Sequence, residues 1–318
     1  MLLSSRSSDK RLLIDSYTKC VLSDKFLYTP VHLFDKELRQ EVTETKRLIA
    51  LLREHGVHVK FTNPVGPLLI NFAKRNHKKL VVIDDRIAYI GGINFSEHNF
   101  FWHDMMLRIE LPDIVTFLKE DFLATWNEQP LARSKDFGNI RIDLLNGYSN
   151  EVVFSEIFDV MESAKRRIFI ETPYLTSPFI EKLRKIRRNG VSITIVVPEV
   201  NNWMLMSTYN RWEALRSDFD LRLYKDRLTH LKAMLIDDDV LIVGSLNFTY
   251  LSCHFQEEII ARITDKQVIS RFEHAVIQQD LEHSEKFEGR IHDFPGYLSA
   301  CIVRVSLKPW GFSDLSQM

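Results

Sequence analysis

Apolar and polar positions along the first part of the chain form patterns that predict both helices and strands. Residues 41–55 carry apolar side chains at helical spacing and end before Gly56, and glycine commonly follows the last turn of a helix. Pro112 and Asp113 open a second predicted helix, which runs to about Trp126. Shorter apolar runs predict strands at residues 11–17, 57–61, 79–83, 87–90 and 105–109.

The second part of the chain repeats much of this order. Helices are predicted from Pro178 to Gly190, over residues 203–216, and from Asp265 onward. Strands are predicted at residues 167–171, 191–197, 221–225, 232–236, 240–243 and 258–263. Strands that alternate with helices are typical of α/β proteins with a mixed sheet.

We therefore expect an α/β fold of two similar lobes, each a mixed β-sheet flanked by helices. A pseudo-twofold axis would relate the lobes and place the active site between them. The first lobe is expected over residues 1–130 and the second over residues 151–284. The polar, glycine-containing residues 131–150 predict a linker, and residues 285–318 predict an irregular tail with a short strand near residues 302–305.

Composition narrows the classes of function. The apolar fraction of 45% and the charged fraction of 27% are those of a folded globular chain. A formal net charge of −1 provides no global basic field, which disfavours nucleic acid as a partner. Three widely spaced cysteines without a Cys-x-x-Cys pair predict buried thiols in a reducing compartment, not disulfides or a zinc site. No segment has the apolar length of a signal peptide or membrane span, so we expect a cytoplasmic protein that meets membranes peripherally.

Two eight-residue segments share one pattern of chemically active side chains. Residues 77–84 read HKKLVVID and residues 230–237 read HLKAMLID, so histidine, lysine and aspartate recur at the same spacing. Further residues recur in pairs at matching positions after each histidine: Gly92 and Ser245, Asn94 and Asn247, Asp104 and Glu258. A single motif of this kind arises by chance, but two with matching companions indicate an internal repeat that carries chemistry.

The spacing has a simple geometric consequence. Alternate residues of a strand project from the same face, so His77 and Lys79 point the same way, as do His230 and Lys232. The strand that follows each motif ends near a small residue and an asparagine, which lets a ligand approach closely. An imidazole, an ammonium and an amide from each half together suit the binding of a phosphate group.

The twin motifs resemble those of the phospholipase D superfamily, and residues 75–94 (RNHKKLVVIDDRIAYIGGIN) are most similar to its cardiolipin synthase branch. Residues 102–108 and 172–174 resemble that branch too, and the resemblance covers most of residues 11–280. It implies a two-step displacement at phosphorus through a phosphohistidine, without metal or cofactor. Relatives usually begin with a strand and a helix ahead of the segment that matches residues 11–17, and the first half here lacks them.

The resemblance implies a role for each paired residue. His77 is expected to be the nucleophile and His230 the general acid and base. The expected phosphate ligands are Lys79, Lys232, Asn94, Asn247, Ser245 and Gly92. Asp104 and Glu258 are expected to orient the imidazoles, with Glu257 as the competing choice for Glu258. Asp84 and Asp237 belong to the motifs, but their place at a turn favours bracing the hairpin over contact with substrate.

The substrate is less sharply defined. Apolar and aromatic side chains at residues 94–102 and 203–206 are compatible with acyl chains at a pocket mouth, and equally with an ordinary core. The first hypothesis is phosphatidyl transfer between two phosphatidylglycerol molecules, or hydrolysis by the same site, at a peripheral membrane surface. The second is a phosphodiesterase or nuclease that acts on nucleic acid. A binding scaffold with an inactive site is disfavoured by the two complete motifs, and no obligate protein partner is expected.

Overall fold

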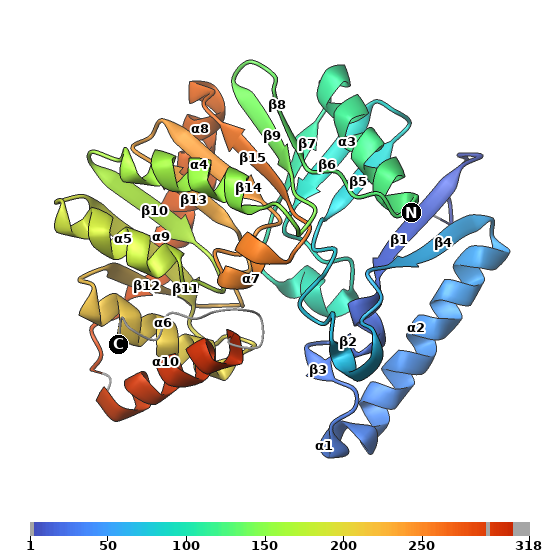
Figure 1. Ribbon diagram of the computed structural model, residues 1–318, viewed down its shortest axis with the longest axis horizontal. Helices are drawn as coiled ribbons and strands as arrows, with labels where there is room; N and C mark the ends of the chain where they lie inside the picture. The colour runs from blue at the N-terminus through green and yellow to red at the C-terminus, as the bar shows by residue number, and fades with distance from the viewer. Residues whose placement is uncertain (1–2, 291–292, 308–318) are drawn as a thin grey trace.

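A computed structural model of the protein describes residues 3–290 and 293–307. Two β-rich lobes face each other, the first half of the chain in blue to teal and the second in green to red (Figure 1). The expected α/β fold of two lobes that contain sheets and helices is confirmed.

The second lobe is built on one nine-stranded sheet. In spatial order its strands are β16 (Ser284–Lys286), β12 (Asp220–Tyr224), β11 (Ser192–Pro198), β10 (Arg167–Glu171), β13 (Ala233–Ile236), β14 (Val240–Gly244), β15 (Ile259–Ile263), β9 (Ile140–Leu144) and β8 (Arg133–Asp136). Strands β10, β11 and β12 run parallel to one another, and the other neighbours pair antiparallel. The sheet is therefore mixed, as the alternation of strands and helices predicts.

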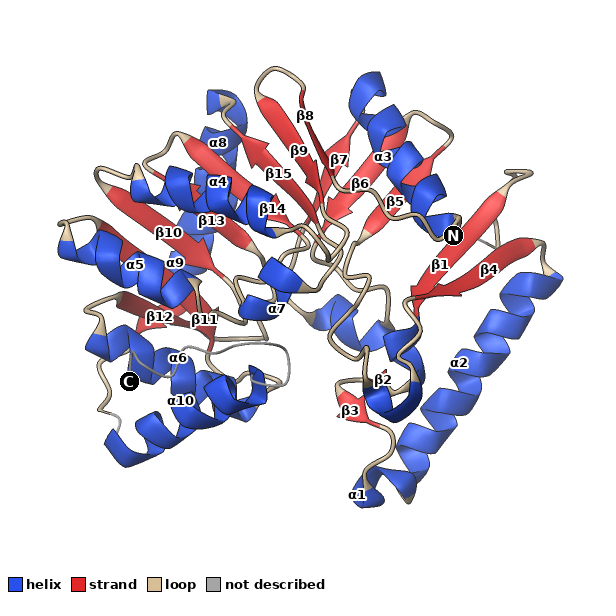
Figure 2. Ribbon diagram, in the orientation of Figure 1, coloured by secondary structure: helices blue, strands red, loops and turns tan. Residues whose placement is uncertain are grey.

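Helices cover both faces of this sheet (Figure 2). Helices α4 (Glu151–Glu162) and α5 (Phe179–Arg188) pack on one face, and α8 (Lys266–Phe272) and α9 (Gln278–Glu282) lie on the other. A π-helical turn at Glu273–Ile277 joins α8 to α9. Helix α6 (Met204–Arg216) packs against α10 (Asp293–Leu307), and the short α7 (Tyr250–His254) precedes β15.

The first lobe consists of two separate sheets. Strands β5 (Leu80–Ile83), β6 (Ile87–Gly91) and β7 (Met106–Ile109) form an antiparallel sheet, with α3 (Pro112–Trp126) in contact with β5 and β6. Strands β1 (Lys10–Asp15) and β4 (Val57–Thr62) form a parallel pair connected through α2 (Lys36–Glu54). Small elements fill the connection from β1 to α2: β2 (Val21–Leu22), β3 (Lys25–Phe26) and α1 (Pro30–Leu33).

The first lobe is divided into two sheets because it lacks a strand that the second lobe has at the equivalent position. The order β1-α2-β4 repeats β11-α6-β12, and β5-β6-β7 repeats β13-β14-β15. In the second lobe β10 pairs with both β11 and β13 and so joins the two groups. No strand among residues 3–290 and 293–307 joins β1 to β5 in this way. The sequence predicts a first half without the leading strand that relatives have, and the described residues confirm this prediction.

A shared hydrophobic core joins the lobes. Ala88 and Ile90 of β6 and Leu118 of α3 belong to the same buried cluster as Leu241 and Val243 of β14. The strands that carry the two motifs therefore pack against common neighbours, which fixes the position of one lobe relative to the other.

Two segments differ from the sequence-based expectation. Residues 133–144, expected within a linker, form β8 and β9, and β9 pairs with β15 at the edge of the large sheet. The expected strand near residues 302–305 is wrong, because these residues belong to α10. Helix α10 packs its apolar side on α6, and this tertiary contact overrides the β-branched character of the segment. Within the described residues, no helix combines the length and apolarity needed to cross a bilayer.

Candidate active site

The two histidines lie where the lobes meet, each held by the backbone of the other half. The backbone N–H of His77 donates to the carbonyl of Glu257 (2.9 Å), and the N–H of His230 donates to the carbonyl of His103 (2.7 Å). Asn76 forms a parallel bridge with Glu257, and His103 forms one with Thr229. The chain before each histidine therefore runs beside the chain before the carboxylate of the opposite half.

This crossing pairs each imidazole with a carboxylate from the other lobe. His77 Nδ1 lies 3.1 Å from Glu258 Oε1, and His230 Nδ1 lies 2.7 Å from Asp104 Oδ2. An ionised carboxylate can only accept, so each Nδ1 carries the proton and each Nε2 keeps its lone pair. Glu257 accepts a hydrogen bond from Asn63 and contacts no histidine ring in the described residues. Of the two candidate glutamates, Glu258 is therefore the partner of His77.

Small-residue positions hold the two carboxylates in place. The Ser245 hydroxyl donates to Glu258 Oε2 (2.5 Å) and accepts from the backbone N–H of Ile259 (3.0 Å). At the matching position in the first half, a Cβ on Gly92 would lie 2.2 Å from Asp104 Oδ1. Ser245 and Gly92 thus lie against the carboxylates, and their expected part in phosphate binding stays a prediction.

The lysines of both motifs are buried in the same electrostatic environment. Lys79 donates to the carbonyl of His77 (2.8 Å), and Lys232 Nζ lies 2.8 Å from His230 Nδ1 and 3.2 Å from its Nε2. Burial lowers the pKa of Lys232 to about 8, although Asp104 and Glu258 both act to raise it. Burial also lowers the pKa of Lys79, and charges from both lobes act on this ammonium. The two motifs thus contribute to one site.

Both imidazoles are neutral in the free site. Burial lowers the pKa of His77 to about 4, and Glu258 only partly offsets this effect. Burial, together with the charge of Lys232, lowers the pKa of His230 to about 3. Burial opposes ionisation of Asp104 and Glu258 as well, but their cationic neighbours and hydrogen bonds hold the pKa of each below its ordinary value.

Acid is therefore expected to destabilise the fold through these histidines. Between pH 6.5 and about 4, the unfolded chain binds protons on both histidines and the folded chain does not, so the free energy of unfolding falls as the pH falls. The loss should amount to a few kcal/mol, since one pKa unit corresponds to about 1.4 kcal/mol. Urea titrations from pH 4 to pH 8 measure it. The His77→Asn/His230→Asn double variant should show a shallower slope, and an unchanged slope would contradict the assignment.

The paired asparagines follow the motifs in equivalent turns. The carbonyl of Asn94 accepts from the N–H of Ser96 (3.0 Å), and that of Asn247 accepts from the N–H of Thr249 (2.8 Å). The Asn247 side chain is largely buried, and its Oδ1 has no hydrogen-bond partner in the described structure. This free atom is an acceptor and suits a ligand hydroxyl, whereas a phosphate oxygen would need the Nδ2 donors of the same amide.

The two motif aspartates have different surroundings. The Asp237 carboxylate accepts from the backbone N–H groups of residues 165, 166 and 167, at 2.5, 2.8 and 2.8 Å. These hydrogen bonds outweigh burial and hold the pKa of Asp237 below its ordinary value. Asp84 occupies the same type of turn but is exposed, because the first lobe has no strand equivalent to β10 beside it. Asp237 therefore ties the turn of its hairpin to the start of β10, whereas Asp84 is exposed at its turn.

These surroundings predict unequal effects of the same substitution. Asp237→Ala leaves three backbone donors without their acceptor and should lower the free energy of unfolding by about 2–3 kcal/mol. Asp84→Ala removes an exposed side chain and should change it by less than about 0.5 kcal/mol. Chemical denaturation of the two variants tests this directly, and equal losses would contradict it.

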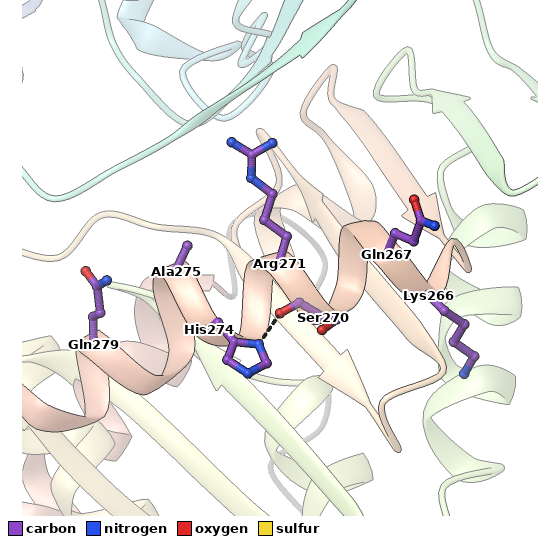
Figure 3. A pocket seen from close by; sticks show the side chains of 7 residues that line it. All are labelled: Lys266, Gln267, Ser270, Arg271, His274, Ala275 and Gln279. Carbon is purple, nitrogen blue, oxygen red and sulfur yellow. Dashed lines mark hydrogen bonds between the residues drawn. The ribbon is translucent and has the colours of Figure 1, made fainter.

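Two aromatic residues near the site were not among the predicted site residues, although both lie in segments that resemble the cardiolipin synthase branch. The Trp102 ring lies 4.8 Å from the His230 ring, and the Tyr174 ring lies 6.4 Å from it, measured between centroids. Trp102 also lines a pocket of about 560 Å³ together with Asn201, Asn202 and Leu228. A larger hollow of about 710 Å³ lies on the outer surface of α8 and the turn that follows it (Figure 3). It contains no motif residue, whereas the pocket of about 560 Å³ adjoins His230 through the Trp102 ring.

Comparison with known proteins agrees with this geometry. A family profile described as "Cardiolipin synthase, PLD-like domain" matches residues 3–126 and 157–279, well over half of the chain. The chain belongs to this phospholipase D-like family of cardiolipin synthase domains. The resemblance predicted from the twin motifs is thus confirmed, and the family match covers one histidine motif in each half.

Individual members of the family cover most of the chain. The minor cardiolipin synthase ClsB of Bacillus subtilis is 30% identical over 264 residues, which are 76% of this chain and 65% of that protein. Cardiolipin synthase 1 of Staphylococcus epidermidis is 25% identical over 314 residues, 89% of this chain and 62% of that protein. The chain thus spans somewhat less than two thirds of these relatives. A crystal structure of phosphatidylserine synthase from Haemophilus influenzae shares the fold, with a TM-score of 0.59, 13% identity and coverage of 98% of this chain and 91% of that one.

Proposed function

We propose that the protein is a phosphatidyl transferase that joins two phosphatidylglycerol molecules into cardiolipin and releases glycerol. The observation that carries this proposal is the crossed pairing of His77 with Glu258 and of His230 with Asp104. It leaves two imidazole Nε2 atoms, one from each motif, available to the same buried site.

The reaction we propose has two displacements at phosphorus. Nε2 of His77 attacks the phosphodiester, the bond to the first glycerol oxygen breaks, and His230 protonates that oxygen. The hydroxyl of a second phosphatidylglycerol then gives its proton to His230 and attacks the phosphohistidine, which releases His77. Lys79, Lys232, Asn94 and Asn247 are proposed to hold the non-bridging oxygens, contacts that contribute about 10²–10³ in rate when they strengthen in the transition state.

The charge balance of the site explains how one imidazole becomes an acid. Two lysine ammonium groups and two carboxylates cancel when both histidines are neutral. A bound phosphodiester adds one negative charge, which favours one proton on an imidazole. Substrate binding would therefore favour a proton on one imidazole although their pKa values in the free site are about 4 and 3. We place that proton on His230 because His77 must stay neutral to attack phosphorus.

The surroundings of the site favour a lipid substrate at a membrane surface. Phe100 and Phe101 are exposed and directly precede Trp102, which contacts the ring of His230. Met204 is also exposed. It lies two residues after Asn202, whose Oδ1 accepts a hydrogen bond from the Tyr174 hydroxyl. Apolar side chains beside the site suit acyl chains, and we propose peripheral binding to the bilayer through them. The names of the relatives above point to the same class of substrate.

Purified protein incubated with phosphatidylglycerol vesicles, without added metal, should form cardiolipin and an equal amount of free glycerol. Phosphatidic acid in place of cardiolipin would mean that water wins the second step and would replace transfer by hydrolysis. Single-stranded DNA is the parallel substrate. Cleavage of DNA with inert lipid would overturn the proposal in favour of a nuclease of the same superfamily.

A further inference from the structure

Three side chains from separate elements lie close together beside the segment that leads into His230. His103 precedes β7, Glu171 ends β10, and Asp280 lies in α9, just after the π-helical turn. One ligand atom from each lies within 4.8 Å of the others. Glu171 and Asp280 are 0% and 3% exposed, so two carboxylates share the interior of the second lobe.

This pair of carboxylates lacks a matching positive charge. Among the described residues, the one basic side chain recorded within 4.0 Å of either is His103, at 2.9 Å from Asp280 and 4.0 Å from Glu171. The exposed Arg227 guanidinium lies 3.4 Å from His103 Nδ1, on the side of the ring away from the carboxylates. One imidazole can balance at most one of two carboxylates, and two buried carboxylates are costly unless another charge compensates them.

One oxygen of this cluster also lacks a hydrogen bond. The Thr229 hydroxyl donates to Glu171 Oε1, but Glu171 Oε2 is buried and has no partner in the described structure. Buried carboxylate oxygens without partners are uncommon, and a bound cation is one group that would satisfy such an oxygen. This observation is separate from the charge imbalance and leads to the same kind of ligand.

We propose that His103, Glu171 and Asp280 bind a divalent first-row cation such as Zn²⁺. In a tetrahedral zinc site with bonds of about 2.0–2.1 Å, neighbouring ligand atoms lie about 3.3 Å apart. The separations of 2.9 and 4.0 Å from His103 Nε2 bracket that value. One imidazole and two carboxylates suit zinc, whereas calcium and magnesium favour ligand sets made of oxygen alone.

Neighbouring groups orient two of the three ligands. The His103 ring stacks on Tyr224, with centroids 4.8 Å apart and planes 10° apart, which fixes the direction of its nitrogens. The hydrogen bond from Thr229 orients Glu171. Zinc at Nε2 requires the ring proton on Nδ1, so the exposed Arg227 side chain would turn away on binding.

The ion would act as a positioning group for the site beside it. His103 directly precedes Asp104, the carboxylate partner of His230, and Thr229 directly precedes His230. A bound cation would tie both segments to β10 and α9 without contact with the reacting phosphate. This inference does not depend on the substrate of the enzyme, so its failure and that of the proposed function can be told apart.

The full chain, stripped of metal with a chelator and dialysed, should bind one Zn²⁺ per molecule in a competition titration with a chromophoric chelator. Binding should raise the thermal midpoint by at least about 4 °C at saturating zinc. The same zinc should bind to the His77→Asn/His230→Asn double variant, because the catalytic histidines are not ligands. Magnesium and calcium should give no comparable shift.

Glu171→Gln and Asp280→Asn should each weaken zinc binding at least tenfold and remove the thermal shift. His103→Gln, at the exposed edge of the cluster, provides a third variant if either buried substitution prevents folding. The matched control is His254→Gln, because His254 forms a surface pair with Glu151 at 3.0 Å and should not affect binding. The proposal is overturned if the wild type binds no zinc, if the three variants bind like the wild type, or if the His77→Asn/His230→Asn variant loses the site.

Discussion

Replacing His77 with asparagine should abolish turnover of phosphatidylglycerol, with a fall of at least about 10⁴-fold in kcat. The amide cannot form the covalent phosphoryl intermediate, and its geometry leaves the hydrogen bond to Glu258 available, so the fold should be retained. Radiolabelled substrate and rapid acid quenching measure both turnover and the intermediate. Retention of more than one hundredth of the wild-type rate would contradict a nucleophilic role.

His230→Asn distinguishes the second histidine from the first. Its expected role is to protonate the leaving oxygen, so a substrate with a good leaving group, such as a p-nitrophenyl phosphodiester, should partly restore the first step. The same substrate should not rescue His77→Asn. His254→Gln, at a surface histidine, is the control and should keep wild-type activity. Rescue of the His77 variant alone would reverse the two roles.

Breaking either crossed carboxylate pair should cost about 10²–10⁴ in kcat with little change in KM. Asp104→Asn and Glu258→Gln keep the size of each side chain but remove the charge that orients Nδ1–H and stabilises an imidazolium. The acidic limb of the pH–rate profile should shift, which loss of packing alone would not produce. Steady-state kinetics from pH 5 to pH 9 measure both effects.

The pairing across the lobes makes the prediction for the two carboxylates more specific. Glu258→Gln should add little to the defect of His77→Asn, because both changes disable one unit. Combined with His230→Asn, the same Glu258→Gln change should show a different coupling, since His230 pairs with Asp104. Equal coupling of Glu258 to both histidines would contradict the crossed arrangement.

Sequence patterns predicted the strands and helices that surround the motifs but not the crossing itself. Asp104 and Glu258 follow their own histidines at nearly equal distances, and nothing in that spacing indicates which imidazole each contacts. The crossing depends on parallel backbone bridges between the halves, a tertiary feature. Ser245 was expected beside a bound phosphate because a small residue lets a ligand approach closely, and in the fold its hydroxyl also donates to Glu258.

The misassigned segments have a similar explanation. The strand at residues 140–144 contains polar residues that the sequence pattern assigns to a loop. In the fold these residues form hydrogen bonds, because Arg141 and Arg262 of the neighbouring strand both donate to Asp143. His103, Glu171 and Asp280 are far apart in the chain and match no motif, so their convergence could be found only in three dimensions.

The missing strand between β1 and β5 has a consequence for how the enzyme would lose activity on heating. In the described residues no strand lies between β1 and β5, and the residues of β5 are only half-buried, whereas all four residues of β13 are buried. Local opening should therefore begin in the N-terminal half, which carries His77. Catalysis would then fail at a lower temperature than the cooperative melting of the nine-stranded sheet, leaving an inactive but still largely folded molecule.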